Sequence, residues 1–299
     1  KIEPRFYVPV LPMLAINGSE GVSIGFAQKI LPRKPKEIMK WVKQRASGER
    51  ITANLTPHWE GMSCVVNKGE SKVQWEITGS FVRNTKHRIT INSLPVGYTL
   101  KQYQAVLEKL VDDKVIKDYD DLSDNDVFEF EIQVDRAFGE RTDEWIMTKL
   151  KLIKKVSENF TCIDENNKIV IFKGLKELLE AWYVKRIEYN DKRKQHLLAS
   201  MQEEMDYTNA RAKFIQGVVD GAIELRNTKE AAVITQAEAY DAILQGRVKG
   251  FLGLPMRSLT TEEIAKLKAK AKALKSEITA YSKHTFEDIL IQDLGSITI

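Results

Sequence analysis

The sequence contains no apolar run approaching the roughly 18 consecutive residues of a membrane-spanning helix, which excludes a span of that kind. No basic-then-apolar signal segment opens the chain either. Only two cysteines occur, Cys64 and Cys162, and neither forms a Cys/His pair at zinc spacing. A reduced intracellular protein is therefore the simpler interpretation. Because the chain starts at Lys1 without an initiator methionine, we expect a fragment or a processed product.

Motifs that carry catalysis are also scarce. There is no Gly-x-x-x-x-Gly-Lys-Ser/Thr loop, which disfavours a P-loop ATPase. The four histidines are scattered, and no serine or cysteine lies in a recognisable nucleophile context. Asp124-x-Asp126 resembles part of a carboxylate metal site, but it lies in an acidic turn, so a solvated loop is the better interpretation. The sequence predicts no metal site in this chain.

Proline is nearly confined to the first third of the sequence. Seven of the eight prolines precede residue 96, and the eighth is Pro255. Because proline is disfavoured inside helices and central strands, the interval between them is expected to contain long regular elements.

We predict an α+β fold: a mixed α/β domain followed by a long antiparallel coiled coil with a small helical tip. The middle zone, residues 41–172, alternates helix-like and strand-like patterns. Strands are expected at residues 73–77, 88–91 and 128–134, a helix at 99–110 and a hairpin around 165–167. The first zone, residues 1–40, is expected to be extended chain that leads into a glycine-rich turn.

Residues 175–225 contain no proline, little glycine and many charges, which predicts a helix of roughly 75 Å at 1.5 Å per residue. A helix of this length needs a partner. Near the C-terminus, Ile264, Leu267, Ala271, Leu274, Ile278 and Tyr281 follow alternating spacings of three and four, an a/d seam.

The seam expected on the long helix is less regular. It consists of Tyr183, Ile187, Leu197, Met201, Ile215, Val218, Ala222 and Leu225, and it is interrupted by Asn190, Lys194, Glu204, Thr208 and Arg211. The predicted division is residues 173–225 and 258–290 as the coiled coil and residues 226–257 as a partly apolar tip. Exposed apolar tips often mark association surfaces.

Charge is unevenly distributed. The net charge of the chain is +4, yet residues 1–50 contain ten Lys/Arg against four acids. A polyanion should therefore meet the N-terminal segment, although a merely solvated basic face would look the same.

The segment from Asn17 to Lys36 combines three features that suit a phosphate-rich ligand. Gly18, Gly21 and Gly25 allow close backbone approach and expose amide donors. Basic residues follow, and an apolar residue, Ile30, is predicted to be an exposed wedge that enters between base pairs and kinks a duplex. The basic candidates for phosphate contacts are Lys29, Arg33, Lys34 and Lys36.

Three stretches in the same order resemble type IIA DNA topoisomerases. Residues 6–38, with Pro-Val-Leu-Pro leading into Asn-Gly-Ser-Glu-Gly, resemble the segment that follows the family's active-site tyrosine. Residues 175–194 resemble the start of the family's long coiled-coil helix, and residues 251–260 resemble the entry into its returning helix. The Pro-x-x-Pro form is closer to eukaryotic and tailed-phage enzymes than to bacterial gyrase, and the short C-terminal end favours the phage type.

The resemblance implies a role for each part of the chain. Ile30 would intercalate into and bend the gate DNA, while Asn17 to Gly25 and the basic residues would contact its backbone. Residues 1–40 would end the DNA-gate region, residues 41–172 would be the tower domain, and the tip would form the exit gate of a homodimer.

The resemblance also implies what this chain lacks. The catalytic tyrosine would precede Lys1, so the fragment is expected to be inactive by itself. Mg²⁺ and ATP would bind outside this chain, on an ATPase and metal-binding partner subunit, and the enzyme would work in the cytoplasm, on the host nucleoid for a phage. Two alternatives remain open: a non-enzymatic coiled-coil protein that clamps DNA, and a dimerisation scaffold without a DNA role.

Overall fold

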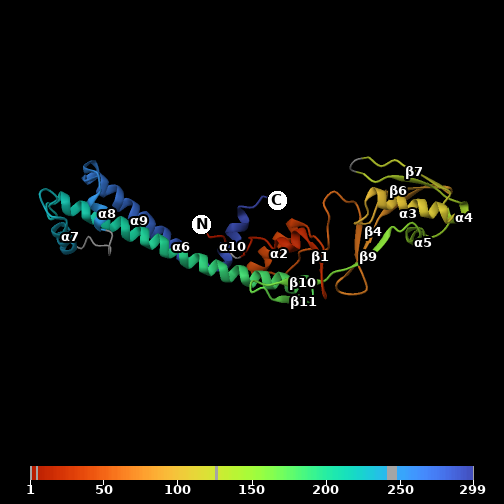
Figure 1. Cartoon of the computed structure of the whole chain (residues 1–299), viewed down its shortest axis with the longest axis horizontal. Coiled ribbons are helices and arrows are strands. Elements are labelled where there is room, and N and C mark those ends of the chain that lie inside the picture. The colour runs from red at the N-terminus through yellow and green to blue at the C-terminus, as the bar shows by residue number, and fades with distance from the viewer. Residues whose placement is uncertain (1, 5, 125–126, 241–247, 299) are drawn as a thin grey trace. The chain divides into compact units, whose positions relative to one another are not determined.

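The computed structural model describes residues 2–4, 6–124, 127–240 and 248–298, and it divides into two compact units (Figure 1). The first unit extends to Val184 and the second covers Lys185–Ile297. A single 45-residue helix, α6, belongs to both.

The elements of the first unit before α6 are α1 (Met13–Asn17), β1 (Ser19–Ser23), β2 (Phe26–Ile30), α2 (Pro35–Ala46), β3 (Val65–Lys68), β4 (Gln74–Thr78), β5 (Ser80–Thr85), β6 (Arg88–Ser93), α3 (Leu100–Asp112), β7 (Asp118–Asp121), β8 (Phe130–Gln133), α4 (Arg136–Gly139), α5 (Asp143–Lys149), β9 (Ile153–Ser157), β10 (Phe160–Ile163) and β11 (Ile169–Phe172). Those that follow are α6 (Leu175–Val219), α7 (Glu230–Ala239), α8 (Val248–Leu252), the 3-10 turn η1 (Met256–Ser258), α9 (Thr261–Lys283) and α10 (Phe286–Gly295).

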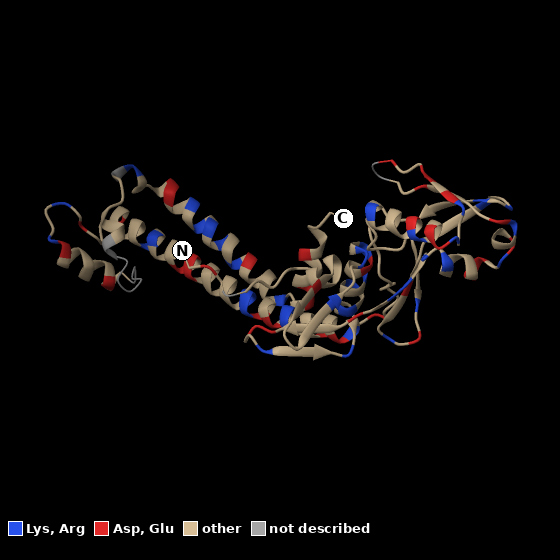
Figure 2. Ribbon diagram, turned by 45° about the vertical axis from the view of Figure 1, so that its right-hand side comes forward, with Lys and Arg blue, Asp and Glu red and all other residues tan. Residues whose placement is uncertain are grey.

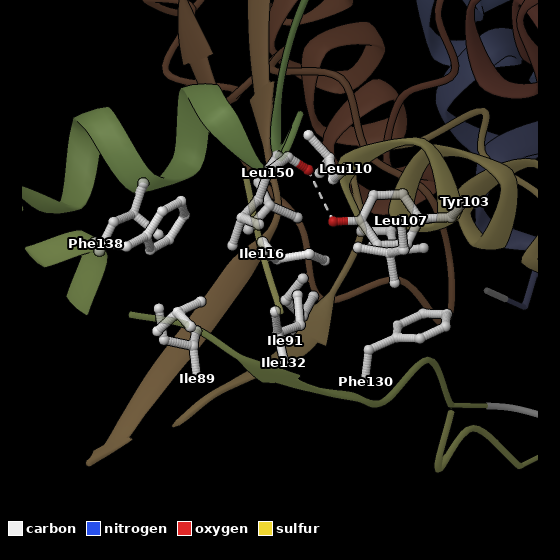
Figure 3. Close-up of a cluster of buried hydrophobic side chains, with 14 residues drawn as sticks. Ile89, Ile91, Tyr103, Leu107, Leu110, Ile116, Phe130, Ile132, Phe138 and Leu150 are labelled. Atoms are coloured by element: carbon white, nitrogen blue, oxygen red, sulfur yellow. Dashed lines mark hydrogen bonds between the residues drawn. The ribbon is translucent and has the colours of Figure 1, made fainter. Parts of the chain in front are cut away.

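A four-stranded antiparallel sheet, in the order β5-β6-β8-β7, forms the centre of residues 80–134. Ile89 and Ile91 of β6 and Phe130 and Ile132 of β8 alternate along their strands and are fully buried. The apolar face of α3 packs against them, and the hydroxyl of Tyr103 donates to the Leu150 carbonyl at 2.8 Å (Figure 3). This core confirms the strands and the helix expected in that region.

Two hairpins and a three-stranded sheet complete the first unit. The sheet has the order β3-β4-β9, and the hairpins are β1–β2 and β10–β11. Lys29 and Asn159 form an antiparallel bridge, so β2 lies beside the start of β10. The predicted hairpin around residues 165–167 is confirmed, whereas Met13–Asn17, expected to be extended, forms the short helix α1 directly after Pro12.

In the second unit α6 and α9 run antiparallel. Ion pairs join Glu204 to Lys270 at 2.7 Å and Arg211 to Glu263 at 3.1 Å, so residue numbers rise along one helix as they fall along the other. The first four residues of the predicted α9 seam, from Ile264 to Leu274, are buried, and Ala212 and Ile215 of α6 pack against the first two of them. The side chain of Thr260 caps α9 by accepting from the Glu263 amide. The pairing fits the predicted coiled coil.

Four of the five polar residues that interrupt the predicted α6 seam, all except Thr208, bond to the returning chain. Asn190 is 1% exposed and donates to the Phe286 carbonyl at 3.1 Å, and Lys194 donates to the carbonyls of Ser282 and His284 at 2.9 and 2.6 Å. Towards its end α6 is shorter than predicted. It ends at Val219, before Gly221, whose φ of +75° is unsuited to a helix.

The predicted tip, residues 226–257, contains α7, α8 and η1, and residues 241–247 within it lie outside the described part of the chain. Phe251 is 1% exposed, and its ring centroid lies 5.4 Å from that of Tyr207 and 5.6 Å from that of Phe214. Val233 and Ala237 of α7 are buried in the same cluster. These residues form a small core at the end of α6, and the association surface expected of the partly apolar tip stays a prediction. None of the described helices combines the length and apolar character needed to cross a membrane.

Candidate nucleic-acid interface

The β1–β2 hairpin presents apolar side chains to solvent. Ser23 pairs with Phe26, so the turn consists of Ile24 and Gly25, and Gly25 has a φ of +79°. Val22 is 91% exposed and Ile24 is 99% exposed. Because exposed aliphatic surface is unfavourable in water, this tip is a candidate contact surface for a partner.

Ile30, the predicted wedge, is not at this tip. It is the last residue of β2, it is 2% exposed, and it packs with Phe160 and Leu178 in a small core. The expectation of an exposed Ile30 is therefore wrong, because the bridge between β2 and β10 turns this side chain inward. The signal that could have indicated Val22 and Ile24 is their position between Gly21 and Gly25, at the turn of a two-strand pattern.

Arg33 is also buried, with 2% exposure, although it was expected to contact phosphate. Its guanidinium forms a two-pronged ion pair with Glu158, with Nη2 at 2.7 Å from Oε2, and its Nε donates to the Leu55 carbonyl at 3.1 Å. Glu158 also accepts from the Leu31 amide and the Trp75 indole. Since these partners satisfy both charges, Arg33 has a structural role and no phosphate contact is assigned to it.

The other predicted residues of the segment lie in or beside the hairpin. Asn17 is exposed at the end of α1, and Lys29 is half-buried and pairs with Glu20 across the hairpin at 2.6 Å. Gly18 has φ +68° and ψ 176°, and a side chain there would lie 2.6 Å from the Ile30 carbonyl. Gly21 has neither constraint, since nothing lies within 4 Å of an added Cβ. A bulky ligand approaching the hairpin would use that open space.

Helix α2 presents lysines on the face opposite its core. Ile38, Trp41 and Val42 are buried, whereas Lys36, Lys40 and Lys43 are exposed with spacings of four and three. Lys34, directly before the helix, is exposed as well. None of these four lysines has an ion-pair partner among the described residues.

Lys40 and Lys43 were not among the predicted contact residues, although their helical spacing with Lys36 is a signal the sequence contains. The first unit therefore offers exposed cations and an exposed apolar hairpin. Across the residues described, no group of three His, Cys, Asp or Glu side chains is placed to hold a metal ion. The described residues therefore do not fit a catalytic Mg²⁺ site, and Asp126 of the Asp124-x-Asp126 pair lies outside them.

Known proteins resemble this chain over almost its whole length. A family model that describes the A subunit of DNA gyrase/topoisomerase IV matches residues 1–295. Among the relatives, a DNA topoisomerase 2 of Penicillium chrysogenum is 24% identical over 98% of this chain and 21% of its own length. The DNA topoisomerase medium subunit of Enterobacteria phage T4 is 25% identical over 92% of this chain and 63% of its own length.

A solved structure also matches the fold. The DNA-binding, cleavage and re-ligation domain of Plasmodium falciparum topoisomerase II superposes with a TM-score of 0.79 at 22% identity, over 98% of this chain and 44% of that one. The chain thus spans less than two thirds of each of these proteins.

Proposed function

Because the chain belongs to the family of DNA gyrase/topoisomerase IV A subunits, we propose that it is the DNA-binding, gate-forming part of an ATP-dependent type II DNA topoisomerase. In such an enzyme one duplex is broken on both strands, a second duplex passes through, and the break is rejoined. The observation that carries the proposal is the exposed apolar tip of the β1–β2 hairpin in the same compact unit as the unpaired lysines of α2.

The lysines supply the contacts to the DNA backbone. Ammonium groups without acidic partners release counterions from DNA when they bind phosphates, and each phosphate neutralised adds roughly 0.9 to the salt dependence of binding. Lys34, Lys36, Lys40 and Lys43 meet this requirement, together with the exposed backbone around Asn17 and Gly21. Lys29 would have to leave its ion pair with Glu20 to make such a contact.

The proposed wedge is the hairpin tip instead of Ile30. An apolar side chain that enters between base pairs must be exposed in the free protein, and Val22 and Ile24 are almost fully so. Kinking a duplex costs a few kcal/mol, which additional contacts between the bent DNA and the basic surface offset.

Fluorescence-transfer measurements of DNA bending test the wedge. With a duplex labelled at both ends, V22A/I24A is expected to abolish most of the bending while DNA affinity falls less than tenfold. V65A/V82A is the matched control, because Val65 and Val82 are exposed to 53% and 52% on other strands. Equal bending by the tip variant and the control would remove the tip from the mechanism.

The salt dependence of duplex binding tests the lysines. K36A/K40A/K43A is expected to lower the slope of log affinity against log salt by up to about 3, since three phosphate contacts are lost. K268A/K272A/K275A on α9 is the control, because these three lysines are exposed and have the same spacings of four and three. Figure 2 marks the Lys and Arg positions of the ribbon in blue. A decrease of the same size in both variants would mean that general charge, not this surface, binds the duplex.

The rest of the enzyme is proposed to contribute the other chemistry. We propose that the nucleophilic tyrosine, the Mg²⁺ site and the ATP site lie in parts outside these 299 residues. The α6–α9 arm and the tip at residues 226–257 would form the exit gate by pairing with a second copy through a twofold axis. Such an enzyme would work where its duplex is, in the cytoplasm of a bacterium or a phage-infected host.

A non-enzymatic DNA clamp was the main alternative. The family match along residues 1–295 gives it no support, because the relatives are named as topoisomerases.

A further inference from the structure

A cavity of about 910 Å³ lies in the first unit, apart from the hairpin tip and the α2 lysines. Its walls come from the loop before β3, from β3 and β4, from the start of β10 and from the first turn of α6. This volume is in the range of roughly 300–1,000 Å³ that is typical of small-molecule sites.

The cavity is positively charged. Five basic and three acidic residues line it. The acidic residues already have partners within the chain: Glu158 is bound by Arg33, Glu180 by the Arg45 guanidinium at 3.0 Å, and Glu177 accepts from the Lys173 amide at 2.6 Å.

The lysines of the lining have no such partners. Lys68, Lys72, Lys173 and Lys176 are exposed, and among the described residues none has an ion pair with a carboxylate. They come from two sides of the cavity, the β3–β4 segment and the start of α6. Four unpaired ammonium groups around one concavity favour a ligand with more than one negative charge.

The remaining walls are apolar and half-buried, so part of each side chain is open to a ligand. They include Leu55, Val66, Trp75 and Leu175. The exposed side-chain amides of Asn54 and Asn67 stand at the same cavity. A flat base, hydrogen-bonding edges and a phosphate are the three features that a nucleotide presents to a protein, and these walls match each of them.

We propose that this cavity binds one nucleotide, with the base against the apolar wall and the phosphates among the four lysines. A stacked duplex does not enter a concavity of this size, so the ligand is either a free nucleotide or a single unpaired nucleotide of a DNA strand. The site is distinct from the duplex-binding surface, because none of Val22, Ile24, Lys36, Lys40 and Lys43 lines it.

Calorimetry on the full chain tests this site, with dAMP, dTMP, inorganic phosphate and a short single-stranded oligonucleotide as probes. At least one mononucleotide, or the oligonucleotide, is expected to bind at least tenfold more tightly than phosphate. K72A/K176A should weaken that binding about tenfold, and K101A/K109A should not, since Lys101 and Lys109 are exposed on α3 away from the cavity.

A second variant distinguishes the contribution of the cavity's shape from that of its lysines. N67W is expected to fill the cavity and abolish nucleotide binding while all four lysines remain. Binding of a mononucleotide identifies a free-nucleotide site, and binding of the oligonucleotide alone identifies a strand site. Nucleotide binding no tighter than phosphate, or equal in all three variants and the unaltered chain, overturns the proposal. Duplex bending measured alongside reports separately on the hairpin tip.

Discussion

Gly18 has a backbone conformation that residues other than glycine rarely adopt. Its φ of +68° with ψ 176° lies in a region that is essentially restricted to glycine, at a cost of about 1–3 kcal/mol for other residues. A Cβ at this position would also meet the Ile30 carbonyl at 2.6 Å and the Pro32 nitrogen at 2.9 Å. The base of the β1–β2 hairpin therefore depends on this one residue.

We expect G18A to destabilise the chain by about 2 kcal/mol or more, because strain and steric overlap add at the same position. Urea unfolding measures the loss. G21A is the matched control, since Gly21 has open space around it and no positive φ, and its free energy of unfolding should change by less than about 0.5 kcal/mol. Equal losses in both variants would contradict this account of Gly18.

Ile30→Ala is expected to reduce stability rather than act mainly on DNA. Truncating a buried isoleucine costs about 2–5 kcal/mol through lost burial and a residual cavity, and Ile30 is 2% exposed beside Phe160 and Leu178. Thermal and urea unfolding should both show this loss of stability. In the V22A/I24A variant the free energy of unfolding should remain within about 1 kcal/mol of the unaltered chain, since both side chains are exposed. An I30A protein as stable as the unaltered chain would show that the small core contributes little.

The sequence indicated residues 17–36 as a candidate contact region, but it did not indicate which side chains face solvent and which are buried. The glycines, the basic excess and the apolar positions of residues 17–36 all indicated a contact region. The burial of Arg33 depends on Glu158, which lies 125 residues away, and no local pattern encodes that meeting. Ile30 was misassigned for the same reason, since Phe160 and Leu178 bury it.

Among the helices, α9 was the most predictable element. A regular apolar spacing and a capping threonine determine its position, and both operate within a few residues. The seam of α6 was harder, because Asn190 and Lys194 look like defects until their carbonyl partners near the end of α9 and the start of α10 are known. The role of polar residues between two paired helices could therefore not be predicted without the tertiary structure.

Asn190→Leu tests that interpretation, because it makes the predicted seam more apolar. We expect a loss of about 1–3 kcal/mol, since the Phe286 carbonyl at the start of α10 loses the Asn190 donor in a part-buried setting. The measurement is urea unfolding. K270L is a useful comparison, because Lys270 and Glu204 are both half or more exposed and their ion pair should contribute less than about 1 kcal/mol. A stabilising N190L would mean that hydrophobic pairing alone determines the register.

For the chain as a whole, a mixed α/β part followed by a long helix was predictable, and the division into compact units was not. The structural division lies between Val184 and Lys185, inside α6, where a continuous helix has no proline or glycine to mark it. The four predicted segments, 1–40, 41–172, the coiled coil and the tip, remain a prediction about family architecture.

Dimerisation is a further prediction for the whole chain. The chain is expected to sediment as a dimer at micromolar concentration through the end of α6 and the tip. Val219 and Leu225 are 41% and 38% exposed there, so V219D/L225D should shift the equilibrium to monomer at least tenfold. V65D/V82D, which alters exposed valines elsewhere, should remain dimeric. A monomeric unaltered chain, or dissociation by both variants, would contradict exit-gate pairing.

The Arg33–Glu158 pair also has an evolutionary consequence. Losing either partner leaves an uncompensated buried charge that costs about 3–5 kcal/mol, a large share of a typical domain's stability. Selection should therefore remove a change at only one of the two positions, and the two positions should covary. Among close relatives, we expect both residues to be kept or both to be replaced by apolar residues. An alignment in which the arginine is kept opposite a neutral residue would contradict this expectation.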